Sequence, residues 1–196
     1  MAPLPFPERQ GEREPKKELP YGGWTAPRTI DSRLVRIFDG SRVEIRGEGK
    51  DLCQKDCRSL VLKRQPDFDF TAEFELRLSG EKMVADTGMT LYYDENTYIK
   101  FGITESTVFV TEYIDQDYVR RVGMPFYGEE GPLIFRVETR GLTRSFFLNG
   151  REICTWDNVT SICSEGLVKG KRFTGAMYGV YNNGKNPVRW RQHGYI

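Results

Sequence analysis

Acidic residues are the first place to look for chemistry in this sequence, because a pair of carboxylates can act as acid and base. Glu73 and Glu75 lie two residues apart in a strand-like stretch, so their side chains point to one face about 7 Å apart. That spacing is near the carboxyl separation used in glycoside hydrolysis. Polar neighbours share the face, which is also typical of a solvated surface. A small glycoside hydrolase or polysaccharide lyase therefore stays as one hypothesis, with weak candidates Glu73, Glu75, Glu105 and Glu112.

A second kind of chemistry is suggested by the tyrosines between residues 89 and 113. If the apolar residues of this stretch face a core, alternation places Tyr92, Tyr98, Lys100 and Tyr113 on the opposite face. Flat rings beside hydrogen-bonding groups suit a sugar, which has apolar C–H faces and a rim of hydroxyls. The alternative is that these rings lie under another layer or stiffen the sheet. The predicted ligand-binding residues are Tyr92, Tyr98, Lys100, Tyr113, Arg120 and Trp156.

The sequence contains few residues spaced to bind a metal or able to support histidine catalysis. His193 is the one histidine, three residues from the end, which argues against sites that need two imidazoles or a catalytic triad. The four cysteines do not have the spacing of a zinc site, so we expect buried or idle thiols and leave a disulfide open. The cysteines are Cys53, Cys57, Cys154 and Cys163. No cofactor or metal ligand set is predicted, and a structural calcium has no supporting motif.

The net charge and the lack of long apolar stretches limit the partners that we expect. With 29 basic and 28 acidic side chains in 196 residues, the net charge of +1 makes nucleic acid an unexpected partner. No membrane-spanning stretch or signal peptide is predicted, so we expect a soluble and slightly favour a cytoplasmic protein. After Glu165 the chain has no acid but several bases, including Lys185, Arg189 and Arg191. These bases either meet an acidic polysaccharide or pair with acids elsewhere in the fold.

The elements that must position these residues are strands. Residues 68 to 78 alternate strictly between apolar and polar, and Asn149-Gly150 between two apolar runs is a strong hairpin signal. About a dozen short strands, with no pattern for a crossover helix, predict an all-β sandwich of two antiparallel sheets in jelly-roll order. Gly175 and Gly179 predict a curved strand or a close backbone approach. We expect a Pro-rich charged arm over residues 1–20 and one domain over 21–196. The predicted strands span residues 34–38, 42–46, 59–63, 68–78, 89–93, 98–103, 107–113, 133–139, 144–148, 152–156, 173–181 and 188–191.

Several blocks in this order resemble a known family. They are Ser59–Gln65 running into Phe68–Glu73, Gly88–Asn96 running into Tyr98–Ile103, and Phe173–Ala176. Together they resemble the C-terminal concanavalin A-like module of family 43 β-xylosidases and arabinofuranosidases. The resemblance implies a β-sandwich that follows a catalytic propeller, helps to shape its active site, and belongs with modules regarded as xylan-binding. The chain has no length for a propeller, so the family's catalytic residues have no counterpart here.

The leading hypothesis is therefore a non-catalytic module that binds a xylan-like or other β-linked plant polysaccharide or oligosaccharide. Two alternatives stay open: the small enzyme above, and an interaction module that docks on a separate catalytic subunit. Whether the tyrosine face is open distinguishes the binding module from the alternatives, because a binding module needs an open groove lined by the tyrosines.

Overall fold

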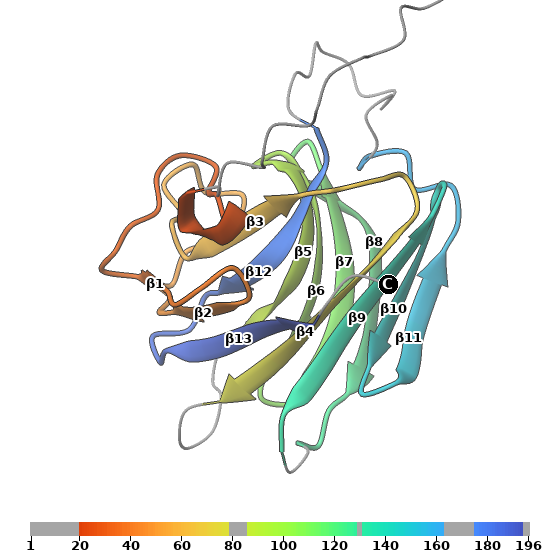
Figure 1. Cartoon of the computed structure of the whole chain (residues 1–196). Helices are drawn as coiled ribbons and strands as arrows, with labels where there is room; N and C mark the ends of the chain where they lie inside the picture. Colours follow the sequence, from red (N-terminus) through yellow and green to blue (C-terminus); the bar gives the residue numbers. More distant parts are fainter. Residues whose placement is uncertain (1–19, 79–85, 129–130, 163–174, 194–196) are drawn as a thin grey trace, which may run out of the picture.

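The computed structural model describes residues 20–78, 86–128, 131–162 and 175–193. Strands within these ranges form two antiparallel sheets that pack face to face (Figure 1). The seven-stranded sheet has the order β1-β2-β13-β4-β9-β10-β11, and the six-stranded sheet has the order β3-β12-β5-β6-β7-β8. The predicted all-β sandwich is thus confirmed.

In the seven-stranded sheet, the last strand of the sequence, β13, lies between two early strands, β2 and β4 (Figure 1, dark blue). Its strands are β1 (Val35–Ile37), β2 (Arg42–Ile45), β13 (Val188–His193), β4 (Phe70–Leu78), β9 (Leu133–Arg140), β10 (Thr143–Leu148) and β11 (Arg151–Trp156). The strands of the six-stranded sheet are β3 (Leu60–Arg64), β12 (Met177–Asn182), β5 (Thr87–Asp94), β6 (Thr97–Ile103), β7 (Thr107–Ile114) and β8 (Asp117–Pro125). A 3-10 turn, η1 (Pro20–Gly23), precedes them.

The main core lies between the two sheets and follows from alternation along each strand. In β4, Phe70, Ala72, Phe74 and Leu76 are buried and point inward, as their even spacing predicts. Trp190 of β13 is 1% exposed, and its ring meets those of Phe74 and Phe135 at 6.4 and 5.5 Å. These three rings belong to one sheet, and Phe135 also meets Phe101 of the other sheet at 4.9 Å, an aromatic contact that holds the two sheets together.

The strand that sequence patterns missed is β8. It is joined to β7 by Asp115 and Gln116, both of which have positive φ angles of 48° and 78°. Two positive φ angles are the geometry of a type I′ hairpin turn, which usually carries Asn-Gly or Asp-Gly. The expected Asn149-Gly150 turn does join β10 to β11, with φ angles of 48° and 78°. The hairpin before β8 therefore has the same geometry without the sequence signal.

Glycine allows the six-stranded sheet to pack closely. A Cβ on Gly179 would collide with the backbone of Val61 on β3, so the close approach predicted there is confirmed. Gly175 precedes β12, and among the described residues no backbone approaches its Cβ position closely. Most of the predicted arm lies outside the described residues, as do Phe173 and Thr174. No helix in the described ranges is long and apolar enough to cross a membrane.

Candidate functional site

Four tyrosines form a row across the outer face of the six-stranded sheet. Strand register places Tyr92 opposite Tyr98, Tyr98 opposite Tyr113, and Tyr113 opposite Tyr118. The rings of Tyr98 and Tyr113 stack at 4.8 Å, and the ring of Tyr118 meets Tyr113 edge-on at 5.1 Å. The shared face predicted for Tyr92, Tyr98 and Tyr113 is therefore present, and β8 extends it by one ring.

Most of this row is covered by the segment between β2 and β3, residues 51–57, which we call the covering segment. Leu52 and Cys57 from this segment pack against Tyr92, Tyr98, Tyr113 and Tyr181 in a second apolar cluster. Tyr92 is 3% and Tyr98 0% exposed, and burial raises the pKa of both phenols. An open groove lined by these tyrosines is thus absent here. The rings lie under another layer, which is the alternative the sequence left open.

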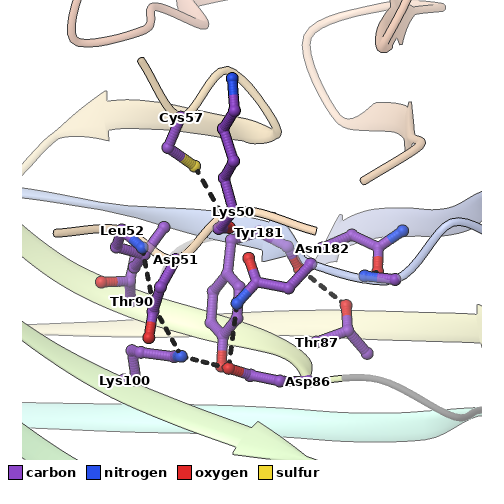
Figure 2. Close-up of polar contacts among 12 residues, drawn as sticks. Lys50, Asp51, Leu52, Cys57, Asp86, Thr87, Thr90, Lys100, Tyr181 and Asn182 are labelled. Atoms are coloured by element: carbon purple, nitrogen blue, oxygen red, sulfur yellow. Dashed lines mark hydrogen bonds and ion pairs between the residues drawn. The ribbon is translucent and has the colours of Figure 1, made fainter. Parts of the chain in front are cut away.

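Lys100 stands at the centre of a buried polar group beside the row. Figure 2 shows Asp51, Asp86 and Tyr181 converging on it from the covering segment, the start of β5 and β12. Its Nζ lies 3.0 Å from Asp51 Oδ1 and also contacts Asp86 Oδ2. The Tyr181 hydroxyl donates a hydrogen bond to Asp86 Oδ1. This network joins three segments that are far apart in the chain.

The charges of this network explain what Lys100 can do. Burial by itself lowers the pKa of Lys100, but the Asp86 and Asp51 carboxylates outweigh burial and hold that pKa above its ordinary value. A lysine that stays an ammonium ion is neither a nucleophile nor a base. Lys100 therefore ties the covering segment to the sheet through its ion pair with Asp51.

Asp51 also connects this network to the accessible end of the row. Its second oxygen, Oδ2, lies 3.4 Å from the Tyr118 hydroxyl. Tyr118 is 49% exposed, and the Arg121 guanidinium lies 5.9 Å from its ring centroid. Register places Arg121 opposite Thr111 and hence on the same outer face. An exposed ring with a carboxylate and a guanidinium beside it is thus the accessible part of this face.

Arg120 and Trp156 lie elsewhere, so the six predicted ligand residues split into two groups. Glu112 pairs with Ile99 in register and points between the sheets, where its Oε2 lies 3.1 Å from Arg120 Nε. Arg120 also donates to the carbonyls of Asp157 and Asn158, at 2.9 and 3.3 Å, and lies over Trp156. This group fastens β8 to the segment after β11. Arg120 therefore does not share the face of the tyrosine row, because neighbouring residues of a strand face opposite sides, and Trp156 lies at the end of β11 in the other sheet.

The four weak acid–base candidates are also dispersed. Glu73 and Glu75 do share an outer face, and His193 lies between them, with Nδ1 3.2 Å from Glu73 and Nε2 3.0 Å from Glu75. Glu105 is exposed in the turn after β6, and buried Glu112 accepts a hydrogen bond from Ser161. Sequence reasoning missed the role of His193, which only the register of β13 against β4 reveals.

Metal and disulfide expectations have separate outcomes. Among the described residues, no cluster of three or more His, Cys, Asp or Glu side chains could hold a metal ion. Cys53, Cys57 and Cys154 carry free thiols, and Cys163 lies outside the described residues. Lys169, Lys171 and Arg172 of the basic C-terminal run also lie outside them.

Two antiparallel sheets in this strand order, with a core between them and a covered outer face, define a concanavalin A-like β-sandwich. The family model described as the β-xylosidase C-terminal concanavalin A-like domain matches residues 22–190, and the chain belongs to this family. No curated protein matches the chain.

Solved structures with the same fold are parts of longer enzymes or stand alone. The family 43 protein BlXynB of Bacillus licheniformis is 22% identical, with a TM-score of 0.74 over 89% of this chain and 36% of that chain. A xylan β-1,4-xylosidase of Bacillus halodurans C-125 is 20% identical, with a TM-score of 0.73 over 96% of this chain and 41% of that chain. A functionally unknown protein from Saccharomyces cerevisiae is 11% identical, with a TM-score of 0.56 over 88% and 93%. The chain thus spans well under half of the two bacterial proteins.

Proposed function

We propose that this module binds a xylan-like β-linked polysaccharide without hydrolysing it. The family supports a role with carbohydrate, since its name and its bacterial neighbours refer to β-xylosidases. The observation that carries the proposal is the accessible end of the tyrosine row, where Tyr118 stands exposed between Arg121 and Asp51.

In this proposal each residue has a defined task. The Tyr118 ring stacks on the C–H face of a sugar, and Arg121 and Asp51 bond to its hydroxyls. Tyr113 supports the ring of Tyr118 from the side, and Lys100 holds Asp51 in place. Tyr92 and Tyr98 act indirectly, because they seat the covering segment that carries Asp51. Such prior positioning reduces the ordering cost of binding.

The test is calorimetric titration of xylohexaose, arabinoxylan and glucuronoxylan into the wild-type chain and two tyrosine variants. Tyr118→Ala removes the stacking ring and should lower affinity roughly five- to tenfold. Tyr127→Ala is the matched control, because Tyr127 is 92% exposed and lies in the connection after β8. Unchanged affinity in Tyr118→Ala would refute the site, and no binding by the wild type would refute the function.

Docking on a separate catalytic subunit is the second candidate. It is favoured by the two bacterial structures, in which the matched region is about two-fifths of a longer chain. Size-exclusion chromatography of this chain with a family 43 catalytic propeller should then show a co-eluting complex. Separate elution at micromolar concentrations would count against docking.

A hydrolase or lyase gains no support from the carboxylates. Glu73 and Glu75 are engaged by His193 and Arg77, and Glu112 by Arg120 and Ser161. A product screen on mixed polysaccharides tests this alternative, and products that disappear in Glu75→Gln would revive it.

A further inference from the structure

The outer face of the seven-stranded sheet carries a groove of about 360 Å³ that lies over β1, β2, β13 and β4. This volume falls in the roughly 300–1,000 Å³ range of small-molecule sites. The groove is on the opposite sheet from Tyr118. Its charged and aromatic lining includes Arg36, Phe38, Arg42, Arg77, Arg189 and Arg191.

Strand register places like charges directly opposite one another in this groove. Arg189 of β13 pairs with Arg77 of β4, and Arg191 of β13 pairs with Arg42 of β2. Like charges in directly opposite positions destabilise a sheet. A local arrangement that works against folding is expected where function requires it.

The carboxylates nearby do not neutralise all five guanidiniums. Arg42 pairs with Asp39 at 2.7 Å, Arg189 with Glu44 at 2.8 Å, and Arg77 with Glu75. The pairing expected for the basic C-terminal residues is thus present for Arg189. For Arg191, none of the residues that the structure describes supplies such a pair.

Arg191 lies opposite Glu75, but both oxygens of that carboxylate are engaged, Oε1 by Arg77 and Oε2 by His193. Neither Arg36 nor Arg191 has a carboxylate partner among the described residues. Both side chains are exposed. Within the described part of the chain, two guanidinium groups therefore have hydrogen-bond donors that can meet an anion.

Phe38 adds an apolar surface to this set of charges. Its ring is 44% exposed, and the Arg36 guanidinium lies 4.9 Å from the ring centroid. Its backbone N–H donates to the Arg42 carbonyl at 3.0 Å, which fixes the ring at the edge of the groove. A small inorganic anion has no apolar surface to pack on such a ring, whereas a sugar has an apolar C–H face that can pack on it.

We infer that this groove binds an acidic sugar, the uronate unit of a glycan. The carboxylate is held in forked hydrogen bonds by Arg36 or Arg191, a geometry that guanidinium groups favour. The pyranose ring packs its C–H face on Phe38. This inference concerns a second face and stands without the Tyr118 site.

The probe is tetragalacturonic acid, with its methyl ester as the uncharged counterpart, titrated by calorimetry at low and moderate salt. The wild type should bind the acid, and raising the salt should weaken binding. The double variant Arg36→Ala/Arg191→Ala should lose about tenfold or more in affinity. Phe38→Ala should lose a few-fold, because it removes only the packing surface.

The matched control is Arg151→Ala/Lys185→Ala, which removes two exposed positive charges outside the groove. It should bind as the wild type does, and thermal unfolding checks that all variants fold. Tyr118→Ala should also retain uronate binding, so failure of one proposal leaves the other testable. The inference is overturned if the wild type fails to bind, if the control weakens binding equally, if the methyl ester binds as well, or if polyglutamate of equal charge displaces the probe.

Discussion

The carboxylate of Asp51 lies 3.0 Å from the ammonium of Lys100, although 49 residues separate them in the chain. This contact fastens the covering segment across the outer face of the six-stranded sheet. It explains why the tyrosine row is closed except at Tyr118. Lys100 thus holds the segment in place together with the packing of Leu52 and Cys57 on the tyrosines.

Replacing Lys100 with Met should lower the free energy of unfolding by about 2 kcal/mol, because it leaves the partly buried Asp51 and Asp86 carboxylates without their counter-ion. Urea unfolding measures the change. Lys185→Ala is the control and should stay within about 0.5 kcal/mol, because Lys185 is exposed. A loss below about 1 kcal/mol for Lys100→Met would mean that the network does not hold the segment.

Gly102→Ala should destabilise the fold by about 2 kcal/mol, because a Cβ at this position would collide with the Tyr181 hydroxyl and the Phe109 ring. Gly123→Ala is a matched control in the same cross-strand row, where a Cβ would make only ordinary contact with Thr107. Thermal unfolding of both variants compares them. Equal effects would show that the Tyr181 hydroxyl, the Phe109 ring and the Thr87 carbonyl all shift at little cost.

Glu112→Gln should cost about 2 kcal/mol of stability, because it weakens a buried, charge-assisted contact with Arg120. Glu105→Gln should leave stability unchanged, since Glu105 is exposed. Chemical unfolding gives both values. Xylan binding should survive in Glu112→Gln, and its loss would place Arg120 at the ligand after all.

Glu75 should make stability depend on pH in the acid range. Its hydrogen bond to Arg77, opposed by burial and assisted by His193, holds the pKa of this carboxyl below its ordinary value of 4.5. A depressed pKa means that its stabilising contribution is complete above the ordinary value and is lost as pH falls through the lowered one. The stability difference between wild type and Glu75→Gln should thus shrink as the pH falls below about 4.5. A difference that does not change down to pH 3 would contradict this assignment.

The sequence by itself determined the class of fold and most of its strands. The alternation of residues 68 to 78 and the Asn149-Gly150 turn are local signals, and both appear in the structure. Local patterns suffice because side chains alternate along a strand and because a tight turn restricts its residues to positive φ angles. The strand β8 escaped because Asp115 and Gln116 adopt that turn without its usual residues.

Only the tertiary structure decided what is accessible. Alternation placed Tyr92, Tyr98 and Tyr113 on one face, but it carries no information on whether residues 51–57 cover that face. Likewise, the position of His193 between Glu73 and Glu75, and of Arg191 beside Arg42, depends on β13 returning between β2 and β4. The covering depends on contacts such as Lys100–Asp51, 49 positions apart, and the register of β13 on contacts such as Arg189–Glu44, 145 positions apart. No short sequence window contains either kind of contact.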